Sequence, residues 1–128
     1  MADTKQIHAH FVPTKSYFVS EAGKEIPITR ESDAYDLLFG ALSACLFATF
    51  DALAKKMRAT WATVDFVVDG QKRESSPTTL EWVTIQVSAT GVEDEEKFLR
   101  AFETATRYCS IYTTISQVAK MTWSVDFS

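Results

Sequence analysis

The chain has 128 residues, of which 46% are hydrophobic and 23% charged, and this is the composition of an ordinary globular protein. A chain of this length predicts a single domain over residues 1–128. The formal net charge of −4 disfavours a nucleic-acid partner, because phosphate binding requires a basic surface.

The N-terminal stretch MADTKQIHAHF is polar and lacks the apolar segment of a signal peptide. The longest nearly uncharged apolar run, residues 37–50, is too short to span a bilayer, so we expect no membrane partner. Without an export signal the expected location is the cytoplasm. In that reducing compartment two cysteines are more often free, metal-bound or redox-active than joined in a structural disulfide.

Residues 5–29 are predicted to form three short antiparallel strands. QIHAHFV alternates in polarity, SYFVS follows Pro13, and EIPIT follows the turn signal EAGK. The two histidines share one face of the first strand, but two imidazoles without a third ligand are poor evidence for a metal site. We therefore expect no metal and no cofactor.

A helix of about 24 residues is predicted next, with Ser32 or Asp33 as its N-cap. Asp36 suits its positive end, and Lys55 and Lys56 suit its negative end. The middle, LLFGALSACLFATF, is apolar or small on every side, which is typical of a helix surrounded by protein. A chain this small cannot easily surround a helix about 36 Å long, so we expect a partner subunit to cover part of it.

Two long strands follow, TWATVDFVVDGQ and LEWVTIQVSA, joined by the turn-like ESSPTT. GVEDEEKFLRAFETATRYC predicts an amphipathic helix, SIYTTISQVA a short helix, and KMTWSVDF a closing strand. The order βββ–α–ββ–αα–β predicts an α+β sandwich with a mainly antiparallel sheet and a long buried central helix. The side chains expected to face inward from the amphipathic helix are Phe98, Leu99, Phe102 and Ala105.

The two cysteines each admit a structural and a chemical interpretation. Cys45 lies in the middle of the apolar helix, where a free cysteine usually packs as a small hydrophobe. Cys109 lies between two predicted helices, and a thiol at a helix N-terminus has a lowered pKa and forms a thiolate readily. Ser110 or Thr113 can equally be the cap of that helix. The chain has no C-x-x-C, phosphate-binding glycine loop, nucleophile elbow or H-E-x-x-H.

The stretch SDAYDLLFGALSAC, followed by two long strands and a second cysteine in CSIYTTI, resembles the osmotically inducible protein C / organic hydroperoxide resistance (OsmC/Ohr) superfamily. Its members carry S-P-Y/E-x-L-L-x-A-L-x-A-C and later C-P-x-[HS]-x-x-[LI]. The resemblance covers essentially the whole chain and is closest in residues 32–50 and 105–116. It implies an OsmC-like fold and an intertwined homodimer with the central helices at its heart.

The resemblance also implies a thiol peroxidase that reduces organic hydroperoxides. Cys45 would become a sulfenic acid, Cys109 would resolve it as a disulfide, and a dithiol would reduce that disulfide. An apolar pocket beside the sulfur is expected, with Phe39, Leu42, Phe47 and Tyr112 as candidate substrate-binding residues.

Peroxidases of this superfamily place an arginine and a glutamate beside the thiol. Here Tyr35 stands at the glutamate position, Asp36 follows it, and Arg30 is the only arginine before the helix. These three are the candidate supporting residues. The proline after the second cysteine is replaced by Ser110, and Tyr112 stands where the pattern has His or Ser. An alternative function is therefore a non-catalytic module that binds a small apolar ligand, or senses redox state, at the dimer interface.

Overall fold

The computed structural model describes residues 4–28 and 33–128 of the chain, which divides between Leu37 and Leu38 into two compact units. The single domain expected from the chain length stays a prediction. The elements are, in chain order, β1 (Ile7–Val12), β2 (Lys15–Ser20), β3 (Glu25–Ile28), α1 (Ala34–Met57), β4 (Thr63–Lys72), β5 (Leu80–Thr90), α2 (Glu95–Tyr108), α3 (Ser110–Ser116) and β6 (Lys120–Phe127).

The first unit contains an antiparallel sheet in the order β1–β2–β3, as the alternating pattern predicts. Tyr17 lies at its centre, opposite His10 on one side and Pro27 on the other. An exposed ion pair of 3.1 Å joins Lys15 Nζ to Glu25 Oε1 across the sheet. Phe11 of β1 is 68% exposed within this chain, so the small sheet leaves a large apolar side chain uncovered.

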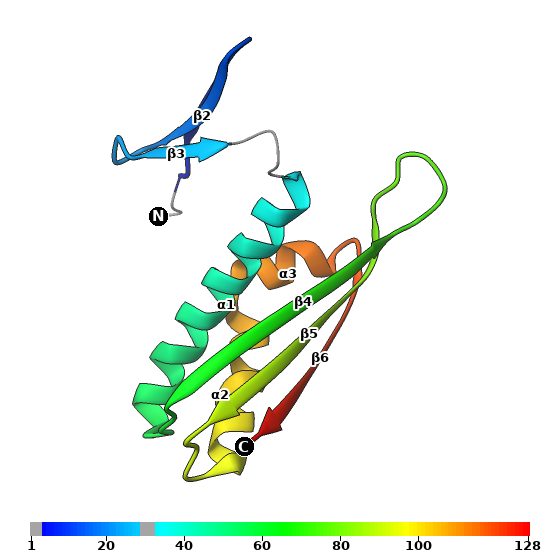
Figure 1. Ribbon diagram of the computed structural model, residues 1–128. Helices are drawn as coiled ribbons and strands as arrows, with labels where there is room; N and C mark the ends of the chain where they lie inside the picture. Colours follow the sequence, from blue (N-terminus) through cyan, green and yellow to red (C-terminus); the bar gives the residue numbers. More distant parts are fainter. Residues whose placement is uncertain (1–3, 29–32) are drawn as a thin grey trace. The chain divides into compact units, whose positions relative to one another are not determined.

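The second unit contains a sheet in the order β4–β5–β6 with the helices on one face (Figure 1). β4 pairs with β5 antiparallel, whereas β5 pairs with β6 parallel because α2 and α3 carry the chain back across the sheet. The described sheets are thus mostly antiparallel. The buried residues of β5 are Val83, Ile85, Val87 and Ala89, as the alternation predicts, and Leu80 at its start.

Helix α1 is capped at its start by its own sequence. The Asp33 carboxylate accepts the backbone N–H of Tyr35 at 2.8 Å, and Asp36 accepts the N–H of Asp33 at 3.1 Å. These reciprocal bonds satisfy backbone donors that a helix start leaves unpaired. Asp33 therefore performs the capping that the sequence predicted for it or for Ser32, which lies outside the described residues.

Helix α1 ends in a left-handed residue, Arg58, with φ 57°. The Ala59 N–H donates to the Ala54 carbonyl at 2.8 Å and the Arg58 N–H to Lys55 at 3.2 Å. This pattern closes helices at a C-terminal residue that is usually glycine. The helix is 24 residues long, as predicted.

Within a single chain α1 is covered on one side only, and the partner subunit expected over the rest of the helix stays a prediction. Its fully buried residues form one stripe of spacing four, Leu42, Leu46, Phe50 and Ala54. The opposite side carries exposed small residues such as Ala44 and Ala48. One sheet face and α2 cover only one side of a helix, because a chain of this size has no further layer to add.

Aromatic rings join α1, α2 and the sheet into one core. The Phe50 ring centroid of α1 lies 4.7 Å from that of Phe98. The Phe102 ring of α2 lies 5.8 Å from Phe50, 5.9 Å from Phe66 of β4 and 4.9 Å from Trp123 of β6. Phe102 is fully buried and its ring contacts rings of α1, β4 and β6, so it lies at the centre of this core.

The inward position predicted for Leu99 is wrong, since its side chain is 37% exposed. The buried stripe of α2 is formed by Phe98, Ala101, Phe102, Ala105 and Thr106. At about 100° per residue Leu99 lies roughly a quarter turn from the centre of that stripe, where the core no longer covers it.

By length and composition α1 is apolar enough to cross a membrane, with a mean hydropathy of 1.9 over its best window. The uncharged run of residues 37–50 is too short to cross a membrane, whereas the whole helix is long enough. A core helix of a globular protein meets the same criterion, and the ring contacts of Phe50 place α1 in a protein core.

We expect Phe102→Ala to lower the free energy of unfolding by about 3–5 kcal/mol, because it leaves a cavity where three elements meet. Urea denaturation followed by circular dichroism measures this loss. The matched control on the same helix is Leu99→Ala, expected to cost less than about 1 kcal/mol at a partly exposed position. Equal losses in the two variants would contradict this account of the core.

Candidate functional site

The sulfur atoms of Cys45 and Cys109 lie 3.2 Å apart, with the Cys109 thiol donating a hydrogen bond to the Cys45 sulfur. Cys45 comes from the middle of α1, and Cys109 from the junction of α2 and α3. A disulfide bond measures about 2 Å, so forming one here requires the sulfurs to move together by on the order of 1 Å. The two cysteines therefore make one dithiol site.

Cys109 is the shared cap of two helices. Its N–H donates to the Ala105 carbonyl at 2.8 Å and ends α2, and its extended backbone turns the chain into α3. Its sulfur accepts the N–H of Tyr112 at 3.4 Å, so Cys109 itself is the N-cap of α3. The choice that the sequence left open between Cys109, Ser110 and Thr113 is thereby settled.

The environment of Cys45 favours its thiolate. The backbone N–H of Ile111 is the main group that lowers the pKa of Cys45. The Cys109 thiol and the side chain and N–H of Ser110 lower it further, while burial opposes them. The Ser110 Oγ lies 4.0 Å from the Cys45 sulfur. Either atom of this last pair can be the donor, and the hydroxyl donates when the sulfur is ionised. Hydrogen-bond donors to the sulfur stabilise the charged form of the acid.

The environment of Cys109 favours the neutral thiol. Its side chain is fully buried, and burial is the main cause of its raised pKa. The hydrogen bond that it donates to Cys45, and the negative charge of the Cys45 thiolate, raise the pKa further. Burial, together with the charge of Cys109, also raises the pKa of the neighbouring Tyr112 phenol. The site thus pairs a half-buried cysteine of lowered pKa with a buried cysteine of raised pKa.

Two of the three candidate supporting residues belong to the first compact unit. Tyr35 and Asp36 are in the first turn of α1 and belong to the first compact unit, where Asp36 caps the helix start. Arg30 lies outside the described residues. Their action on the thiol stays a prediction.

The predicted substrate-binding residues have different surroundings. The Phe39 ring packs on the backbone of β4, where a Cβ on Gly70 would lie 2.6 Å from the ring. Leu42 is fully buried in the core, and Tyr112 is half-buried beside Cys109. Their contact with a substrate stays a prediction.

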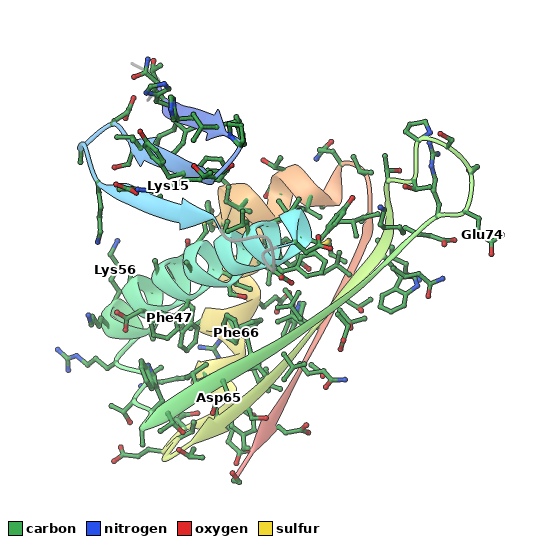
Figure 2. The ribbon with its side chains drawn as sticks, turned by 45° about the horizontal axis from the view of Figure 1, so that its top comes forward. Lys15, Phe47, Lys56, Asp65, Phe66 and Glu74 are labelled. Atoms are coloured by element: carbon green, nitrogen blue, oxygen red, sulfur yellow. The ribbon has the colours of Figure 1, made fainter. Side chains whose placement is uncertain are left out.

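Phe47 borders a shallow, open hollow of about 330 Å³ between α1 and β4. Its other lining residues are Ser43, Ala44, Val64, Asp65 and Phe66. Figure 2 shows Phe47 on α1 with Phe66 and Asp65 on the neighbouring strand. Neither cysteine lines this hollow.

Within residues 4–28 and 33–128, no group of three or more His, Cys, Asp or Glu side chains is arranged to hold a metal ion. His8 and His10 are neighbours in β1, with ring centroids 6.3 Å apart.

A family model described as OsmC-like protein matches residues 32–124 of the chain. The chain belongs to the OsmC-like protein family. The resemblance seen in SDAYDLLFGALSAC and CSIYTTI is thereby confirmed.

Solved structures show the same fold at low sequence identity. An OsmC-like protein from Mycoplasma pneumoniae superposes with a TM-score of 0.84 at 16% identity, over 99% of both chains. A hypothetical protein from Aquifex aeolicus VF5 gives 0.83 at 20% identity, again over 99% of both chains. The organic hydroperoxide resistance protein OhrB of Bacillus subtilis gives 0.68 at 16% identity, over 97% of this chain and 98% of its own. No curated protein matches the chain significantly.

Sequence reasoning about this OsmC-like chain missed the contribution of Ser110 and Ile111 to the thiol. They are the two residues after Cys109, and the serine in place of proline at position 110 was the sequence feature that could have indicated this contribution. No local pattern showed that the start of α3 faces α1, because the contact joins residues 65 positions apart in the sequence.

We expect iodoacetamide near pH 7 to label Cys45 at least about tenfold faster than Cys109, because only Cys45 has a lowered pKa and an exposed edge. Because the charged form of Cys45 is stabilised, its pKa is lowered. Labelling of Cys45 should therefore persist at pH values below the range in which an ordinary thiol reacts. Peptide mapping by mass spectrometry measures both rates. In urea the two rates should converge; equal rates in the folded protein would refute the pKa assignment.

Proposed function

We propose that this OsmC-like protein is a thiol peroxidase that reduces organic hydroperoxides. The observation that supports it is the dithiol of Cys45 and Cys109, with sulfurs 3.2 Å apart and pKa values shifted in opposite directions. Groups whose environments push their pKa values apart divide the roles of a reaction between them. Membership of the family and the printed name of the Bacillus subtilis structure are consistent with the same substrate class.

In the first step the Cys45 thiolate attacks the terminal oxygen of the hydroperoxide. The S–O bond forms, the O–O bond breaks, and the alkoxide takes a proton from solvent to leave as an alcohol. Cys45 is then a sulfenic acid. Cys45 suits this step because a thiolate is the reactive form and this sulfur is the partly exposed one.

In the second step the Cys109 sulfur attacks the Cys45 sulfur. The S–S bond forms, the S–O bond breaks, and hydroxide leaves with the Cys109 proton as water. The short sulfur–sulfur distance favours this step over further oxidation, because the resolving thiol is already in contact. An external dithiol then reduces the disulfide and becomes a disulfide itself. Such reduction requires a reducing compartment, and we assign the protein to the cytoplasm on that ground.

One equivalent of cumene hydroperoxide should remove both free thiols, leave a protein lighter by two hydrogen atoms, and yield one cumyl alcohol. In Cys109→Ser the sulfenic acid should persist on Cys45 and react with dimedone, because no resolving thiol remains. Cys45→Ser should consume no peroxide. Free-thiol assay, intact mass and chromatography of the alcohol measure these outcomes.

Three results would redirect the assignment. Slow, unselective oxidation of both cysteines would refute the peroxidase and leave them as core residues. Formation of the disulfide without turnover by a dithiol would favour the redox-sensing alternative. Binding of a neutral apolar ligand at the hollow of Phe47 would support the ligand-binding alternative, and loss of that binding in Phe47→Ala would locate it.

We further propose a homodimer in which α1 packs against a second copy. The helix has a mean hydropathy of 1.9, yet only 22% of its apolar window is buried within one chain. Exposed small residues on its uncovered side, Ala44 and Ala48 among them, allow another backbone to approach closely. An apolar surface of this kind is normally covered in solution.

Sedimentation equilibrium at micromolar concentration should give a dimer for the native chain. Ala48→Glu should shift it to a monomer, because it buries a carboxylate in the contact. The control Ser124→Glu, at an exposed position of β6, should leave the dimer intact. A native monomer, or equal behaviour of the two variants, would overturn this arrangement.

A further inference from the structure

Ser110 is an exposed residue whose side chain contacts the Cys45 thiol. It is the first residue of α3 and follows Cys109 directly. Its Oγ lies 4.0 Å from the Cys45 sulfur, which is also in contact with Cys109 at 3.2 Å. Two consecutive residues of one segment therefore face the same thiol on α1.

Serine at this position supplies two donors that proline lacks. The sequence pattern that CSIYTTI resembles has proline directly after the second cysteine, and proline carries neither an N–H nor a hydroxyl. Here both the side chain and the backbone N–H of Ser110 lower the pKa of Cys45, beside the N–H of Ile111.

These donors lower the pKa of the thiol, as a nearby cation does in many reactive thiol sites. Among the described residues, every group that lowers the pKa of Cys45 is a neutral donor belonging to Cys109, Ser110 or Ile111. Ser110 alone contributes two of them. The Ser110 carbonyl accepts the Thr114 hydroxyl at 2.8 Å, which helps fix the first turn of α3 on which these donors lie.

We propose that Ser110 is a positioning residue, which directs the Cys45 sulfur at Cys109 by donating hydrogen bonds to it from its hydroxyl and its backbone N–H. This inference rests on the proposed function, in which Cys45 is the attacking thiolate. It adds a residue-specific reason for the reactivity of that thiolate.

The test is the pH profile of Cys45 alkylation in the full-length protein, kept reduced with a phosphine and read by peptide mapping. Ser110→Ala removes the hydroxyl and should slow labelling near pH 7 by roughly threefold. Ser110→Pro removes both donors and should slow it by roughly tenfold. Proline is well tolerated at the first position of a helix, so α3 should be retained. Both profiles should shift to higher pH.

Two further variants separate positioning from a general structural effect. Ser110→Thr keeps both donors and should restore the native profile. Ser116→Ala removes an exposed hydroxyl from the same helix, whose bond goes to the Thr113 carbonyl, and should change nothing. If Ser110→Pro loses its helical circular dichroism, Ser110→Ala and Ser110→Thr decide the outcome.

An unshifted profile in Ser110→Ala and Ser110→Pro, or an equal shift in Ser116→Ala, would overturn the proposal. Alkylation uses no peroxide, so this test can refute the role of Ser110 independently of the proposed peroxidase activity. A native protein that is inert to hydroperoxide but shows the Ser110-dependent profile refutes the peroxidase alone. A protein that turns over peroxide with no Ser110 dependence refutes this inference alone.

Discussion

The packing of α1 onto α2 through aromatic rings is the contact on which the site depends. Phe50 of α1 lies against Phe98 and Phe102 of α2, and Phe102 continues into the sheet through Phe66 and Trp123. These rings fix the separation and rotation of the two helices. The dithiol is a consequence, because one sulfur comes from α1 and the other from Cys109, the residue that ends α2, and the sulfurs touch only when the two helices are held in this register. The packing of the core thus sets the distance between the two sulfurs and with it their reactivity toward each other.

The division of roles within the dithiol follows from where each sulfur lies in that arrangement. The sulfur of Cys109 points into the core, where burial keeps it a thiol. The sulfur of Cys45 lies at the edge, beside the start of α3, where backbone N–H groups stabilise its charge. Cys109 also caps α3, so the residue proposed to resolve the sulfenic acid orients the donors that activate its partner. The short segment from Cys109 to Tyr112 therefore supplies both the second thiol and the donors that face Cys45.

The uncovered side of α1 links the fold to the proposed assembly. Apolar composition predicted a helix surrounded by protein, and within one chain only the stripe from Leu42 to Ala54 is covered. The two observations agree if a second copy covers the remainder, which is the reasoning behind the proposed homodimer. Sequence composition thus carries information about a surface that a single chain leaves exposed.

The sequence by itself determined the elements and the identity of the two thiols. Alternation along β5, the capping aspartate Asp33 and the length of α1 follow from local periodicity and backbone chemistry, and these predictions agree with the structure. Leu99 was misassigned because a quarter turn separates inside from outside on a helix, and only the packed core locates that boundary. The tertiary structure alone decided that Cys45 meets Cys109 and that Ser110 faces the thiol. Contacts between distant segments depend on the relative placement of helices, which is set by the packing of the whole core rather than by any local pattern.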